Sequence, residues 1–109
     1  MGEDQRALRH IVAFRYRPHA TSAQIAQITE AFRALQHAIP GIRAFEHGVN
    51  NSPEGKHQGF THVYVLTFDD AAARDAYLPH PAHAAFGALL RELGVLDDVF
   101  VVDYVPGSA

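Results

Sequence analysis

The chain has 109 residues, of which 48% are apolar, and its formal net charge is −3 at pH 7. This length predicts one domain over residues 1–109 with a buried core, and the acidic balance argues against a nucleic-acid-binding surface. The absence of cysteine excludes disulfides, thiolate nucleophiles and cysteine-ligated metals. No apolar run approaches the roughly 20 residues of a membrane-spanning helix, and the first residues lack an apolar segment of signal-peptide type. A cytoplasmic protein that binds no membrane is therefore the default expectation.

Residues 8–17 alternate in the manner of a strand. One predicted face holds Leu8, His10, Val12, Phe14 and Tyr16. Thr21 then begins a capping box, because a glutamine follows it three residues later. The helix that follows presents a single apolar stripe as far as Ile39, and the Pro40-Gly41 pair ends it.

Residues 42–49 form a weaker predicted strand, and residues 50–59 are entirely polar, glycine or proline, which predicts a long loop. Over residues 60–68, apolar side chains occupy both faces of a strong predicted strand. A strand with one face in water would alternate apolar and polar residues. Something must therefore cover the second face, and in so short a chain we expect a second copy of the same protein.

Asp69 or Asp70 can cap a short helix over residues 70–77. A further helix begins at His80-Pro81, with proline at the first helical position, and ends at Gly94. The last predicted strand, residues 99–105, is apolar on both faces apart from Asp103. The order β-α-β-β-α-β predicts an α+β, ferredoxin-like fold in which two helices cover one face of a four-stranded antiparallel sheet.

The segment Tyr77-Leu-Pro-His-Pro-Ala-His83 holds the strongest candidate for chemistry. On a helical wheel, His83 lies at the edge of the apolar arc, so it can face the space between helix and sheet. A neutral imidazole there would serve as a general base, and Tyr77 could hydrogen-bond to it or to a substrate carbonyl. The alternative is structural: His83 is a half-buried residue at a helix start, and Tyr77 fills the edge of the core.

His10 and His62 each lie mid-strand among large apolar neighbours. We expect their strands to be adjacent, so the two side chains could be close, either as pocket residues or as core histidines satisfied by their neighbours. A zinc site made by His10, His62 and His83 is a weaker alternative, because no tight spacing supports it. Asp103, the one charge in the last strand, is expected to pair with an arginine of the first strand such as Arg15.

Five segments together resemble the stress-responsive α/β-barrel family, usually called Dabb, over residues 8–106. They are residues 10–16, 48–56, 59–68, 77–86 and 102–106. The resemblance implies ferredoxin-like subunits that form a homodimer, sheet to sheet, and so complete a barrel. The family includes plant stress proteins, bacterial proteins and polyketide cyclases related to olivetolic acid cyclase. The cyclases use a catalytic Tyr and His at positions that match Tyr77 and His83, and their pocket histidines match His10 and His62.

This resemblance implies an aldol-type step that needs no cofactor and no metal. His83 would remove a proton next to a carbonyl, and Tyr77 would hold the histidine or the developing enolate oxygen. A ligand-binding or catalytic dimer predicts a closed apolar pocket in each subunit, of roughly 300 Å³ or more. A non-catalytic stress-response or structural dimer predicts packed histidines without a cavity. A third alternative is a cofactor-free monooxygenase of related dimeric-barrel type.

Overall fold

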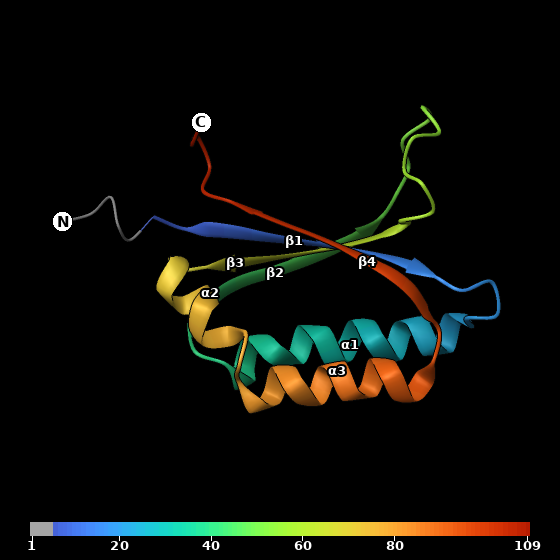
Figure 1. Ribbon diagram of the computed structural model, residues 1–109, viewed down its shortest axis with the longest axis horizontal. Coiled ribbons are helices and arrows are strands. Elements are labelled where there is room, and N and C mark those ends of the chain that lie inside the picture. The colour runs from blue at the N-terminus through green and yellow to red at the C-terminus, as the bar shows by residue number, and fades with distance from the viewer. Residues whose placement is uncertain (1–5) are drawn as a thin grey trace.

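The computed structural model describes residues 6–109 and contains four strands and three helices. In chain order they are β1 (Leu8–Tyr16), α1 (Ser22–Ala38), β2 (Ile42–Val49), β3 (His62–Phe68), α2 (Ala71–Tyr77), α3 (Pro81–Leu93) and β4 (Leu96–Tyr104). The strands form one sheet in the order β2-β3-β1-β4, and every neighbouring pair is antiparallel. All three helices lie on one side of this sheet (Figure 1). The predicted ferredoxin-like fold is confirmed.

The second helical region is split into α2 and α3. The split lies at Pro79 and Pro81, which lack an N–H donor, and His80 before Pro81 has extended backbone, with φ −63° and ψ 138°. The two helices were predicted as separate elements, but the strand boundaries differ from the predicted ones. β3 begins at His62 instead of residue 60, and β4 begins at Leu96 instead of residue 99. β4 is longer because its pairing with β1 continues past an irregularity at Arg15 and Tyr16.

The first helix forms as its sequence predicts. The Thr21 hydroxyl accepts a hydrogen bond from the Gln24 backbone N–H, and the Gln24 side chain accepts one from the Thr21 N–H, so both halves of the capping box are present. The buried face of α1 carries Ile28, Phe32 and Leu35. These side chains pack with Phe14, Tyr64 and Phe86 in the core between helices and sheet.

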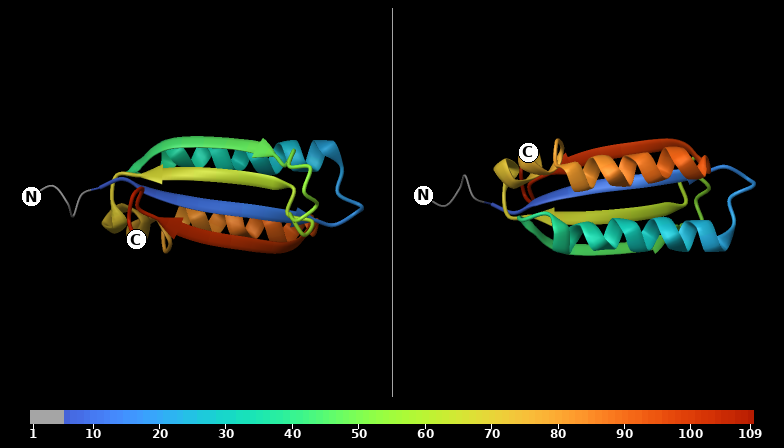
Figure 2. Two further views of the ribbon diagram at one scale, coloured as in Figure 1. Left: turned by 90° about the horizontal axis from the view of Figure 1, so that it is seen from above. Right: turned by 90° about the horizontal axis from the view of Figure 1, so that it is seen from below.

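The other face of the sheet carries no helix (Figure 2). The β4 side chains on this open face are apolar yet exposed: Phe100 is 54% accessible, Val102 46% and Tyr104 48%. Ile11 of β1 and the outward residues of β3 lie beside them, since Ile11 pairs with both Val65 and Val102. The predicted two-faced apolar character of the sheet is therefore present. Within residues 6–109, no helix is long and apolar enough to cross a membrane.

A tight contact at Gly41 positions α2. Gly41 has a φ of +95°, and a Cβ added there would lie 2.7 Å from the Cβ of Ala73 in α2. The Gly41 carbonyl also accepts a hydrogen bond of 2.9 Å from the Asp69 N–H, just before α2. The turn between α1 and β2 thus packs directly on the short helix that ends at Tyr77.

We expect Gly41→Ala to destabilise the protein more than Gly55→Ala does. Both glycines have a positive φ, which costs alanine about 1–2 kcal/mol. Only Gly41 has a close neighbour, however, and an overpacked contact adds about 1–3 kcal/mol. Urea unfolding of the two variants measures the difference. Equal losses would show that the contact with Ala73 relaxes without resistance.

Candidate functional site

Tyr77 and His83 lie together at the junction of α2 and α3. His80 caps α3, because its Nδ1 accepts a hydrogen bond of 3.0 Å from the Ala82 N–H, and Pro81 is the first helical residue. This places His83 in the first turn, and its ring faces that of Tyr77 with 4.3 Å between ring centroids and 33° between planes. The predicted hydrogen bond between the two side chains is not formed. Their rings pack against each other instead.

A backbone carbonyl sets the tautomer of His83. Its Nδ1 lies 2.9 Å from the carbonyl oxygen of Leu78. Because a carbonyl only accepts, Nδ1 must carry the proton of this hydrogen bond. In the neutral ring, Nε2 is then unprotonated and available as a base.

An apolar cavity of about 220 Å³ borders both residues. Its other walls come from β1, α1, α3 and β4, and include His10, Phe14, Phe32, Phe86 and Val101. The Tyr77 hydroxyl forms no hydrogen bond within the described part of the chain. Every fully buried polar side-chain atom there does have a partner. The hydroxyl must therefore border space that a water molecule can reach, and the cavity is that space.

The environment of Tyr77 keeps its hydroxyl protonated. The residue is only 1% exposed. Burial raises the pKa of Tyr77 above its ordinary value, and the negative charge of Asp103 raises this pKa further. The phenol is consequently a hydrogen-bond donor across the physiological pH range.

His10 is the second imidazole of the cavity. It is buried in β1, and its Nδ1 donates to Oδ1 of Asp103 at 2.7 Å. The other carboxylate oxygen, Oδ2, accepts from Nη1 of Arg74 at 2.7 Å. His10 also packs edge-on against Tyr77, with 5.7 Å between ring centroids. Arg74 in α2, Asp103 in β4 and His10 in β1 thus form one connected polar group.

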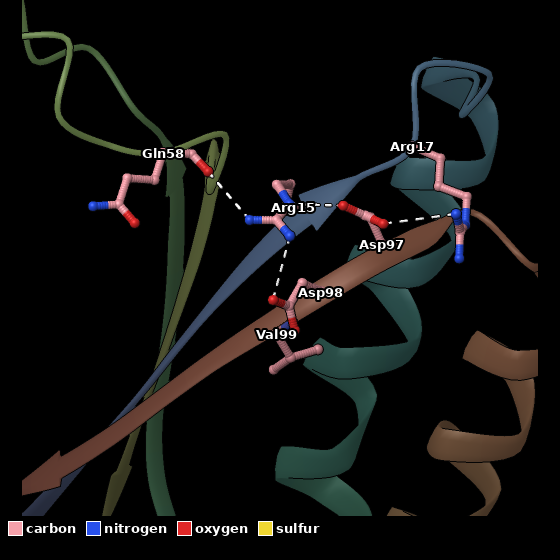
Figure 3. Close-up of polar contacts among 6 residues, drawn as sticks. All are labelled: Arg15, Arg17, Gln58, Asp97, Asp98 and Val99. Carbon is pink, nitrogen blue, oxygen red and sulfur yellow. Dashed lines mark hydrogen bonds and ion pairs between the residues drawn. The ribbon is translucent and has the colours of Figure 1, made fainter.

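The predicted pairing of Asp103 with Arg15 is wrong. The β1–β4 register places His10 opposite Asp103 and Arg15 opposite Asp98. Arg15 instead donates to Asp97 at 2.7 Å, to Asp98 at 3.3 Å and to the carbonyl of Gln58 at 3.4 Å (Figure 3). Arg15 falls on the face of β1 opposite to His10, so this register excludes it as a partner of Asp103. Sequence reasoning also missed Arg74, whose role depends on a helix position that no motif marks.

His62 lies away from these residues. The strands β1 and β3 are adjacent as predicted, but the register pairs His62 with Phe14 and His10 with Leu66. The expectation that His10 and His62 lie close together is therefore wrong, and the three imidazoles of the suggested zinc site do not converge. His62 borders a second cavity of about 440 Å³ with Thr29, Arg33 and His47. Whether it binds a ligand there stays a prediction.

The environment of His62 disfavours its charged form. Partial burial lowers the pKa of His62 below its ordinary value of 6.5, and the nearby His47 lowers this pKa further. Because the folded-state pKa is the lower one, the unfolded chain binds the proton more readily as the pH falls. The contribution of His62 to stability is thus complete above pH 6.5 and is lost as the pH falls through the folded-state pKa.

We expect His62→Gln to flatten this dependence. The free energy of unfolding of the parent protein should fall more steeply below pH 6.5 than that of the variant. Urea unfolding between pH 5 and 8 measures both curves, with His19→Gln as the control because His19 is exposed in the β1–α1 connection. Parallel curves for the parent and His62→Gln would contradict the assignment.

Comparison with known proteins places this geometry in a family. Residues 8–106 match the model of the stress responsive A/B barrel domain, Dabb. The chain is 32% identical to the stress-response A/B barrel domain-containing protein HS1 of Arabidopsis thaliana, over 99% of this chain and 97% of that protein. It is 26% identical to olivetolic acid cyclase of Cannabis sativa, over 92% of this chain and 97% of the cyclase.

Solved structures agree with the sequence relatives. The hydroxynitrile lyase of Passiflora edulis superposes with a TM-score of 0.83 at 26% identity, over 96% of this chain and 97% of the lyase. A ferredoxin-like protein from Jannaschia sp. CCS1, described as dimeric, gives a TM-score of 0.75 at 28% identity, over 90% of this chain and 97% of that one. The chain therefore belongs to the Dabb family of stress-responsive A/B barrel domains.

Proposed function

We propose that the cavity binds a small carbonyl compound and catalyses proton transfer on it without a cofactor. The observation that carries this proposal is the pairing of two groups with opposite roles at one end of an apolar cavity. In its neutral form His83 offers Nε2 as the base, since its Nδ1–H is donated to the Leu78 carbonyl, and Tyr77 offers a hydroxyl that no described protein group occupies. Enolisation needs a base that removes the proton and a donor that hydrogen-bonds to the carbonyl oxygen, and both groups border the same cavity.

The step follows from these roles. The substrate carbonyl would accept a hydrogen bond from the Tyr77 hydroxyl, which keeps its proton because its pKa is raised. Nε2 of His83 would take a proton from the neighbouring carbon. The electron pair of that C–H bond would form a C=C bond, while the π pair of the C=O bond moves to the oxygen. Tyr77 then stabilises the negative charge that develops there. The mostly apolar lining of the cavity lowers the local dielectric, which strengthens both interactions.

His10 is a further partner in this proposal. Asp103, itself held by Arg74, accepts the hydrogen bond from Nδ1 of His10 and so fixes the ring; in the neutral ring, Nε2 is then the unprotonated nitrogen. Two relatives support small-molecule chemistry at such a site, since one is named as a cyclase and the other as a lyase.

The test is deuterium exchange at the α-carbon of phenylacetone, followed by NMR in D₂O. We expect the protein to accelerate the exchange, His83→Gln to lose about 10²–10⁴-fold of that rate and Tyr77→Phe to lose about 10²–10³-fold. Tyr77→Phe is the sharper variant because it keeps the ring that packs on His10 and His83. His19→Gln serves as the matched control, since His19 lies outside the cavity. An exchange rate that is unchanged in His83→Gln, or no acceleration by the parent protein, would refute the proposal.

A second copy of the chain is the occupant proposed for the open face of the sheet. The exposed apolar residues of β4 adjoin the outward residues of β1 and β3, so the face is continuous rather than scattered. A relative of the same fold is described as dimeric. Sheet-to-sheet association would bury this face and close a barrel.

Val102→Glu should dissociate such a dimer. Val102 is 46% exposed on the open face, and burying two symmetry-related carboxylates costs several kcal/mol each, or more than about a hundredfold in affinity. Sedimentation equilibrium would then show a monomer where the parent protein is dimeric. Val49→Glu is the control, because Val49 is also exposed but pairs with His62, on the helix side of the sheet. A Val102→Glu protein that remains dimeric would rule out this face.

A further inference from the structure

Three phenylalanine rings form one wall of the cavity. Phe14 follows His10 by four positions along β1, and Phe86 follows His83 by three positions in α3. Phe32 of α1 packs against both, with ring centroids 6.0 Å from Phe14 and 4.6 Å from Phe86. All three residues line the cavity, so an occupant that contacts Tyr77 and His83 extends toward this wall.

Hydrogen bonds of the buried Tyr64 hold this wall in place. The ring of Tyr64 lies 5.0 Å from that of Phe32, and its hydroxyl is 2.9 Å from the Thr29 hydroxyl and 3.0 Å from the Tyr16 hydroxyl. These hydrogen bonds tie Tyr64 to α1 and β1. Phe32 itself is only 2% exposed, so neither ring has free space into which it can swing.

The volume of the cavity is small for a ligand site. Pockets for drug-sized ligands take roughly 300–1,000 Å³. A cavity of about 150 Å³ accommodates benzene, and water-sized groups take about 30 Å³ each. At about 220 Å³, this cavity has room for one six-membered ring and one or two further small groups.

We infer that Phe32, braced by Tyr64, limits how far a ligand extends into the cavity toward α1, so that the site favours compact ligands of one ring with a short substituent over rings that carry an alkyl chain. The inference rests on the proposed function, since it assumes that ligands occupy the cavity beside Tyr77 and His83. It identifies the substrate class as small aryl carbonyl compounds or acyclic carbonyl compounds of similar size. Phe32 is then the residue that determines ligand length, although it is remote from the acid–base pair.

The limit on ligand length comes from the Phe32 wall and not from the dimensions of the protein. The second cavity begins beyond Tyr64, because Thr29 and His47 line it and both contact Tyr64. The two cavities are therefore separated by the packed rings of Phe32 and Tyr64. Truncating Phe32 should lengthen the first cavity in that direction, since the braced Tyr64 prevents complete collapse.

Binding of a series of 4-alkylphenols tests the inference without relying on catalysis. Phenol can donate to Nε2 of His83, and the alkyl group then points along the cavity. Calorimetric titration should give measurable affinity for phenol and 4-methylphenol and at least tenfold weaker affinity for 4-pentylphenol. Without a wall, each added CH₂ would instead tighten binding about fourfold. The amide NMR signal of Gly87, which lines the cavity, reports whether binding occurs there.

Phe32→Ala should reverse the order of affinities among the phenols. The variant should bind 4-pentylphenol at least tenfold more tightly than the parent protein does. Leu35→Ala is the matched control, because Leu35 is a buried residue on the same helix that does not line the cavity. Phe32→Leu is a milder truncation that serves if Phe32→Ala does not fold, with the same direction expected.

Failure of the size limit can be told apart from failure of the ligand site itself. If the parent protein binds phenol and its affinity rises steadily up to 4-pentylphenol, the size limit is wrong while the ligand site stands. If it binds no phenol and the Gly87 signal does not move, the proposed ligand site itself is refuted, and the inference with it. An unchanged order of affinities in both Phe32 variants would also overturn the assignment of Phe32.

Discussion

The pairing of β1 with two neighbours is the constraint on which the rest of the structure depends. β1 lies between β3 and β4, so its alternation decides what each face of the sheet presents. Its even-numbered residues, among them His10 and Phe14, face the helices and line both ends of the cavity. Its odd-numbered residues, among them Ile11 and Arg15, face the open side. A shift of one residue in this register would exchange the two sets and remove the site.

Two prolines supply the second constraint. Pro79 and Pro81 interrupt what would otherwise be one helix, so that Tyr77 ends α2 and His83 enters the first turn of α3. The interruption leaves the Leu78 carbonyl free of a helical partner, and His83 donates to it. The interruption between α2 and α3 thus brings the two rings together and allows the hydrogen bond from Nδ1 of His83 that leaves Nε2 available.

Local signals in the sequence were sufficient for most of the fold. Alternation located the strands, and the capping box and the Pro40-Gly41 pair located α1, because both features act within a few residues. The Tyr77 and His83 pair was also accessible, since a short, proline-fixed segment holds both. The packing of their rings was not predictable, because His83 donates its hydrogen bond to the Leu78 carbonyl instead of to Tyr77. Which acceptor a side chain finds depends on the groups that the fold brings near.

Long-range pairing accounts for what the sequence could not reveal. The partner of Asp103 and the separation of His10 from His62 both follow from strand register, which a single chain does not encode in any local pattern. The size of the cavity likewise depends on Phe32, a helix residue that meets Phe14 and Phe86 only in the folded state. Sequence alone marks Phe32 as part of an apolar stripe and gives no reason to distinguish it from Leu35.

The strand β4 contributes side chains both to the cavity and to the open face of the sheet. Val99 and Val101 line the cavity, whereas Phe100 and Val102 point to the opposite side. β4 is also an edge strand, with β1 as its one neighbour in the sheet. A single backbone thickness therefore separates whatever fills the cavity from whatever lies against the sheet. A movement of this strand that accommodates one of them alters the contact surface offered to the other, so the two occupancies are thermodynamically linked.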